Sequence, residues 1–143
     1  MTIELKNNAL SNSEKLEAQL LLDQYVSRYV GTFPKKNYDS LMIAIDSISK
    51  SKHNNVRELS IYLRAIVKYL NLENERGFFR KGQHRLLGSL RVFYEVEDVI
   101  PDTIPDRGFL DDIYCVNLAI KAQSKPNRDK IERIVSNLKR VDI

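Results

Sequence analysis

The sequence predicts an all-α protein, an irregular bundle of about five or six helices. Apolar residues recur at three- and four-residue spacing along most of the chain, and no stretch alternates convincingly as a half-buried strand would. Only 5 Gly and 4 Pro occur in the 143 residues, too few for the many turns of a β-sandwich or barrel. A hydrophobic content of 43% with 29% charged residues is typical of a folded globular protein. We therefore expect a flexible tail over residues 1–10 and one helical domain over residues 11–143.

The first helix is expected to begin at Ser11, because Ser11-Asn12-Ser13-Glu14 has the spacing of a capping box. It should run to about Val30 and stop at Gly31, since glycine suits the position after a helix. We expect its core-facing side to consist of the large apolar residues of this segment, Leu16, Leu20, Leu22, Val26, Tyr29 and Val30.

Two more helices are expected before residue 71. Asp39 should cap a short one, which ends at the polar stretch 49–54 and whose apolar residues are Leu41, Ile45 and Ile48. The stretch 55–58 has the spacing of a second capping box. The helix that it opens has the cleanest amphipathic spacing in the chain, formed by Val56, Leu59, Leu63, Ile66 and Leu70.

Three helices are expected in the second half, with a proline-containing loop between the fourth and the fifth. This loop, residues 97–108, contains Pro101 and Pro105, and proline rings clash with the preceding helical turn. Pro126 suits the first turn of the sixth helix. The core-facing residues of the three helices are expected to be Leu86, Leu87, Leu90, Phe93 and Tyr94, then Leu110, Ile113, Val116 and Ile120, then Ile131, Ile134, Val135, Leu138 and Val141.

The loop carries an unusual motif. Leu86-Leu87-Gly88-Ser89-Leu90 leads through Tyr94 to Asp98-Val99-Ile100-Pro101-Asp102-Thr103-Ile104-Pro105, and Gly108-Phe109-Leu110-Asp111-Asp112 follows. In this order and spacing, residues 86–120 resemble the YkvA-like family of bacteria and archaea. The resemblance implies a small helical domain whose biochemical role is unknown.

This chain departs from the family pattern at two places. Glu95-Val96-Glu97 stands where the family often has Ser-Pro-Ile before the first Asp. Asn117 and Lys121 interrupt a helix that is frequently more apolar in the family. These departures argue against a membrane-related role.

Four carboxylates of the motif form the first candidate site: Asp98, Asp102, Asp111 and Asp112. The structural interpretation is that they accept hydrogen bonds in turns and complement the dipole at a helix start. In the functional interpretation they hold a hard cation such as Mg²⁺ or Ca²⁺, which prefers oxygen ligands. We favour the structural interpretation and expect no cofactor, because the spacing is not that of an EF-hand and turns readily accommodate Asp.

A basic segment with interleaved Phe78 and Phe79 forms the second candidate site. Its expected contacts to phosphate or nucleic acid are Arg76, Arg80, Lys81, Arg85 and Arg91. The expected sixth helix also has a basic outer face, which could contact a partner or anionic lipid. We favour the structural interpretation, in which these charges are solvated or neutralised by the acidic loop.

A catalytic set is not recognisable in the sequence. There are two histidines and one cysteine, and neither His53 nor His84 has a neighbouring arrangement typical of nucleophilic catalysis. We expect Cys115 to be a buried small hydrophobe. No Walker loop, dinucleotide fingerprint or zinc spacing occurs.

These observations lead to three functional hypotheses for a bacterial protein expected in the cytoplasm, since no signal peptide or membrane-spanning run is visible. The first is a non-enzymatic helical module that binds another protein or itself. The second is a nucleic-acid-binding accessory protein, which the net charge of +4 permits. The third is a carboxylate-based metal-binding protein or hydrolase.

Overall fold

The computed structural model describes residues 3–5, 10–28, 35–73, 83–94 and 109–141. Within these residues it contains helices and no strand, so the all-α prediction is confirmed. The helices are α1 (Asn12–Arg28), α2 (Lys35–Ile48), α3 (Asn54–Glu73), α4 (His84–Tyr94), α5 (Leu110–Lys121) and α6 (Lys125–Val141). Among the residues described, no helix combines the length and the apolar character that crossing a bilayer requires.

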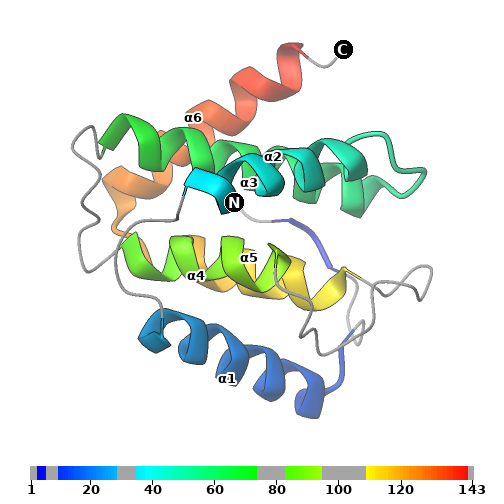
Figure 1. Ribbon diagram of the computed structural model, residues 1–143, viewed down its shortest axis with the longest axis vertical. Helices are drawn as coiled ribbons and strands as arrows, with labels where there is room; N and C mark the ends of the chain where they lie inside the picture. The colour runs from blue at the N-terminus through cyan, green and yellow to red at the C-terminus, as the bar shows by residue number, and fades with distance from the viewer. Residues whose placement is uncertain (1–2, 6–9, 29–34, 74–82, 95–108, 142–143) are drawn as a thin grey trace.

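The helices are stacked in layers (Figure 1). α1 packs on α4 and α5, which also pack on each other. α3 lies against α5 on the other side, with α2 beside it, and α6 lies on the outer side of α3. α1 and α6 therefore form the two opposite ends of the stack (Figure 1).

α3 is the central helix, and the inward face predicted from its amphipathic spacing is confirmed. Its predicted core residues are all buried: Val56, Leu59, Leu63, Ile66 and Leu70. Ser60, Tyr62, Ala65, Val67 and Tyr69 are buried as well, because neighbours cover this helix on more than one side. A helix apolar on most sides is expected at the centre of a bundle.

The predicted capping box of α1 is confirmed. The backbone N–H of Glu14 donates to Ser11 Oγ at 3.1 Å, and the backbone N–H of Ser11 donates to Glu14 Oε1 at 2.9 Å. Two amides that lack partners within the helix are thereby satisfied. α3 instead begins at Asn54, one residue before the expected cap, and α2 begins at Lys35 rather than at Asp39.

The predicted core-facing side of α1 is wrong. Leu16 and Leu20 are 57% and 60% exposed, whereas Ala18 and Leu22 are fully buried. Ala18 and Leu22 form a small cluster with Val92 and Cys115, against which Leu21 packs. The small side chain of Ala18 permits a close approach, since Cys115 Sγ lies 3.5 Å from the Ala18 carbonyl oxygen. The structure describes the backbone but not the side chains of residues 25–28, which include Val26. Tyr29 and Val30 lie outside the described residues.

The described part of residues 1–10 differs from the flexible tail that we expected. Ile3 and Leu10 are 1% and 3% exposed and belong to the main hydrophobic core. The side-chain amide of Asn117 on α5 makes two hydrogen bonds to the backbone of Ile3. Asn117, which seemed to interrupt an apolar helix, therefore fixes a segment that is distant in sequence.

The core-facing residues of the last two helices are predicted almost completely. Leu110, Ile113, Val116 and Ile120 of α5 are buried. On α6, Ile131 and Val135 are buried and Ile134 and Leu138 pack against the core. Val141 is the exception, at 80% exposed, because it is the last residue of α6.

Candidate protein-interaction surface

The start of α5 places two carboxylates in the interior. Asp111 and Asp112 are 1% and 0% exposed, and Arg91 of α4 is also buried. The ring centroids of Phe93 and Phe109 lie 6.4 Å apart, so the end of α4 lies beside the start of α5. Each of the three charged side chains has an interaction partner. Asp111 and Asp112 lie in the first turn of α5, where carboxylates complement the helix dipole.

The other two carboxylates of the candidate cluster, Asp98 and Asp102, lie outside the described residues. Within the part of the chain that is described, no group of three His, Cys, Asp or Glu side chains is placed to hold a metal ion. A metal site at the motif therefore remains a hypothesis of the sequence. Cys115 is fully buried, as expected.

The expected phosphate-contacting residues do not form one described surface. Arg76, Arg80 and Lys81 lie outside the described residues. Arg85 lies on α4 with its guanidinium 3.9 Å from the carboxylate of Asp23. Arg91 is 4% exposed, which removes it from any surface that contacts phosphate. The burial of Arg91 could not be predicted from its position directly after Leu90 in the sequence.

α6 is joined to α3 by an apolar seam with an ion pair near each end. Lys130 Nζ lies 2.9 Å from Glu73 Oε1, and Lys139 Nζ lies 3.0 Å from Glu58 Oε1. Between them the buried residues of α6 are Ile131 and Val135. Two of the cations of this helix are therefore paired with carboxylates of α3.

Tyr62 lies under the end of this seam. Its side chain is buried, and Lys139 Nζ lies 5.9 Å from the ring centroid. Burial, and then the negative charges of Glu58 and Glu132, raise the pKa of Tyr62 from 10.0 to about 12. Both effects disfavour the phenolate.

This shift predicts a loss of stability at alkaline pH. Because the pKa of folded Tyr62 lies above the unfolded value of 10.0, the folded state holds the proton more tightly. The contribution is complete below pH 10 and is lost as the pH rises from 10 toward about 12. The expected loss of unfolding free energy is on the order of 2 kcal/mol. Denaturant unfolding of the parent and of Tyr62→Phe across this range measures it, and equal pH dependence in both proteins would contradict the assignment.

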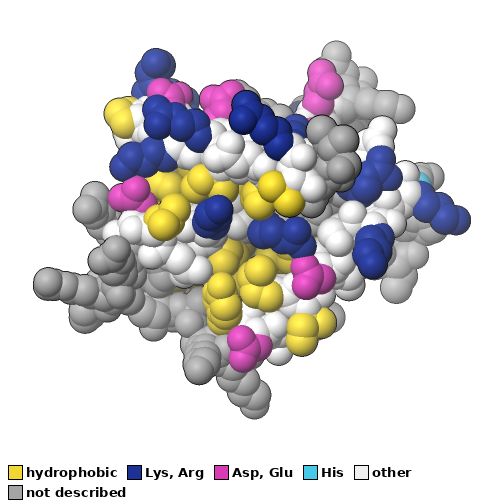
Figure 2. Space-filling model, turned by 90° about the horizontal axis from the view of Figure 1, so that it is seen from above, with side chains coloured by type: hydrophobic (Ala, Val, Ile, Leu, Met, Phe, Trp, Pro, Cys, Tyr) yellow, Lys and Arg dark blue, Asp and Glu magenta, His cyan; other side chains and the backbone are white. Residues whose placement is uncertain are grey.

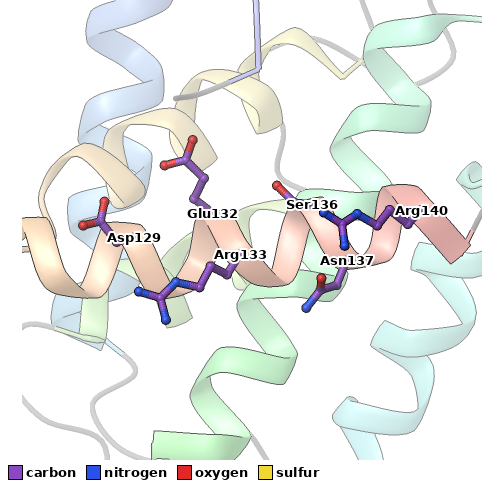
Figure 3. A pocket seen from close by; sticks show the side chains of 6 residues that line it. All are labelled: Asp129, Glu132, Arg133, Ser136, Asn137 and Arg140. Atoms are coloured by element: carbon purple, nitrogen blue, oxygen red, sulfur yellow. The ribbon is translucent and has the colours of Figure 1, made fainter.

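The outer face of α6 carries a shallow, open recess of about 450 Å³. Six residues at helical spacing line it, and we call them the α6 outer face: Asp129, Glu132, Arg133, Ser136, Asn137 and Arg140. In Figure 3, Asp129, Glu132 and Ser136 point to one side, and Arg133 and Asn137 point to the other. The recess therefore has an acidic edge and a basic edge. Lys125 Nζ lies 3.8 Å from Asp129 Oδ2, which partly offsets the acidic edge.

The surroundings of this face combine charge with apolar surface. Figure 2 views the molecule from the α6 end, where Lys and Arg side chains lie around a strip of apolar side chains, with acidic side chains among them. Of the residues that line the recess, arginine is the type that is enriched at protein interfaces. The sequence indicated the basic outer face, but not the recess or its acidic edge.

Comparison with protein-family models, with curated proteins and with solved structures gives no significant match.

Proposed function

We propose that this chain is a non-enzymatic interaction module that binds another protein through the α6 outer face. The observation that carries the proposal is the recess on this face, where Asp129 and Glu132 point to one side and Arg133 to the other, with Arg140 also in its lining. Arg133 and Arg140 are one heptad apart, about 10 Å along a helix. They suit a partner segment that presents two carboxylates at similar spacing.

The acidic edge favours a protein over a nucleic acid. Asp129 and Glu132 would repel a phosphate backbone that followed the arginines. A protein segment can place a Lys or Arg beside Glu132 and carboxylates beside Arg133 and Arg140, so that both edges are matched. Two further cations of the helix, Lys130 and Lys139, are held by Glu73 and Glu58 of α3.

Site-specific cross-linking tests the proposal. A photo-reactive amino acid at Ser136, inside the recess, should capture a specific protein from cells that express the full chain. The same amino acid at Ser47, exposed on α2, is the control position.

The captured partner should then bind the purified parent measurably. Arg133→Glu combined with Arg140→Glu should raise the dissociation constant about 100-fold, which is about tenfold for each reversed charge. Arg128→Glu is the matched control, because Arg128 is exposed on α6 but does not line the recess. Equal loss in the control, or tight salt-sensitive binding of RNA or DNA that the double variant abolishes, would refute the proposal in favour of the nucleic-acid alternative.

A further inference from the structure

The charges of the α6 outer face are arranged so that the face is complementary to itself. Asp129 and Arg140 lie toward opposite ends of the recess, about 16 Å apart along the helix. If a second copy of α6 runs antiparallel to the first, its Arg140 meets Asp129 of the first copy and its Asp129 meets Arg140. The same ion pair then forms twice, as the isologous interface of a two-fold dimer requires.

The other four residues of the face fit the same arrangement. Glu132 and Ser136 point to one side of α6, and Arg133 and Asn137 point to the other (Figure 3). In a two-fold antiparallel pair, side chains on one side of the helix meet side chains on the same side of its copy. Ser136 can thus donate to the carboxylate of Glu132 in the other copy, and Arg133 to the side-chain oxygen of Asn137. The midpoints of these pairs and of the ion pair all fall at residues 134–135, so the contacts share one register.

Other arrangements of the two helices bring like charges together. A shift of one helical turn in either direction places Arg140 opposite Arg133 or opposite Lys125 of the second copy. A parallel pair sets Arg140 against Arg140 and Asp129 against Asp129. Like charges in contact suppress an incorrect pairing. The pattern of charge therefore selects one register and one orientation.

The face is accessible to a second copy. α6 forms one end of the stack, so its outer face looks away from the other helices (Figure 1). Five of the six residues are exposed, and the side chain of Asp129 is 46% exposed beside Lys125. Exposed ion pairs each contribute little to stability and are screened by salt. We therefore expect a weak dimer that salt weakens further.

We propose that the protein bound by the α6 outer face is a second copy of this chain, paired antiparallel about a two-fold axis, with Asp129 of each copy on Arg140 of the other. The inference rests on the proposed function, because it names the partner of the same face.

An exchange of charges between two variants tests the inference. In analytical ultracentrifugation the purified full chain should dimerise with a dissociation constant on the order of 100 µM. Asp129→Arg alone and Arg140→Asp alone should each raise this constant at least about tenfold, because each variant sets like charges against one another twice. An equimolar mixture of the two variants should form a heterodimer with a constant within about threefold of that of the parent, because both ion pairs re-form with their charges exchanged.

The mixture also shows that both variants remain folded. Arg128→Asp is the matched control and should dimerise as the parent does, because Arg128 is exposed on α6 but does not line the recess. The inference is overturned if the parent stays monomeric up to about 1 mM. It is also overturned if the mixture stays monomeric, or if the control loses as much affinity as the two variants.

The photo-reactive amino acid at Ser136 separates this inference from the proposed function. In the purified chain it should cross-link two copies, and the link should map to residues 133–137 of the second copy. A parent that stays monomeric, while Ser136 captures a different protein in cells, would overturn the second copy as partner and leave the proposed function standing. A chain that neither dimerises nor captures any protein at Ser136 would overturn both.

Discussion

Replacing Asp112 with alanine is expected to lower the free energy of unfolding by about 3–5 kcal/mol, the cost of breaking a buried charge interaction. The carboxylate of Asp112 is fully buried, and it has an interaction partner. Removing it takes one negative charge from a region that also contains the buried guanidinium of Arg91. Urea unfolding at neutral pH measures the change.

The matched control for this variant is Asp39→Ala on α2, where the carboxylate is exposed. A surface substitution of this kind should change stability by no more than about 0.5 kcal/mol. A loss below about 1 kcal/mol for Asp112→Ala would show that its carboxylate does not compensate a buried charge.

Melting of the parent and of Asp112→Ala in the presence of cations distinguishes the architectural interpretation from metal binding. With Asp112 as an architectural residue, Mg²⁺ or Ca²⁺ should leave the melting temperature of the parent unchanged. A melting temperature that rises with either cation in the parent and not in Asp112→Ala would mean that the motif binds a cation.

Leu22→Ala is expected to lower the free energy of unfolding by about 3 kcal/mol, within the range for leucines deleted from cores. Leu22 of α1 is fully buried against the α4–α5 layer, in a cluster with Ala18, Val92 and Cys115. Leu20→Ala is the matched control on the same helix, since Leu20 is 60% exposed and its truncation should cost no more than about 0.5 kcal/mol.

The urea midpoints of the two variants show which side of α1 faces the core. They can be compared directly because the dependence of the unfolding free energy on urea should be the same in both variants. Leu20 lies two residues, about 200°, from both Ala18 and Leu22 on the helix, so the two leucines cannot face the core together. A larger loss from Leu20→Ala than from Leu22→Ala would place the opposite side of α1 inward.

Much of the architecture was predictable because it depends on spacing within one helix. The core residues of α3, α5 and most of α6 follow from apolar residues at three- and four-residue intervals. The capping box of Ser11 and Glu14 spans three residues and forms as predicted. The prediction of the core-facing side of α1 was wrong because the large apolar residues of this helix lie on two sides. The small Ala18 lies on the side that packs.

The candidate sites were predicted less completely. The basic outer face of α6 followed from its composition, and Asp111 and Asp112 were correctly placed in the first turn of a helix. Their burial, and that of Arg91, could not be read from the sequence, because a charged residue beside an apolar one gives no sign of whether it is covered. Asp98, Asp102, Arg76, Arg80 and Lys81 lie outside the described residues, so their roles remain predictions.

The sequence by itself determined the fold class, most helix positions, the cap of α1 and the inward faces of the central helices. Each of these depends on residues a few positions apart, where the geometry of the helix fixes the neighbours. The tertiary structure alone decided which side of α1 packs, the partnership of Ile3 with Asn117 and the burial of three charges. These depend on contacts between segments that are distant in the chain, such as the separation of 114 residues between Ile3 and Asn117. Such contacts are set by how whole helices pack together, which local spacing does not encode.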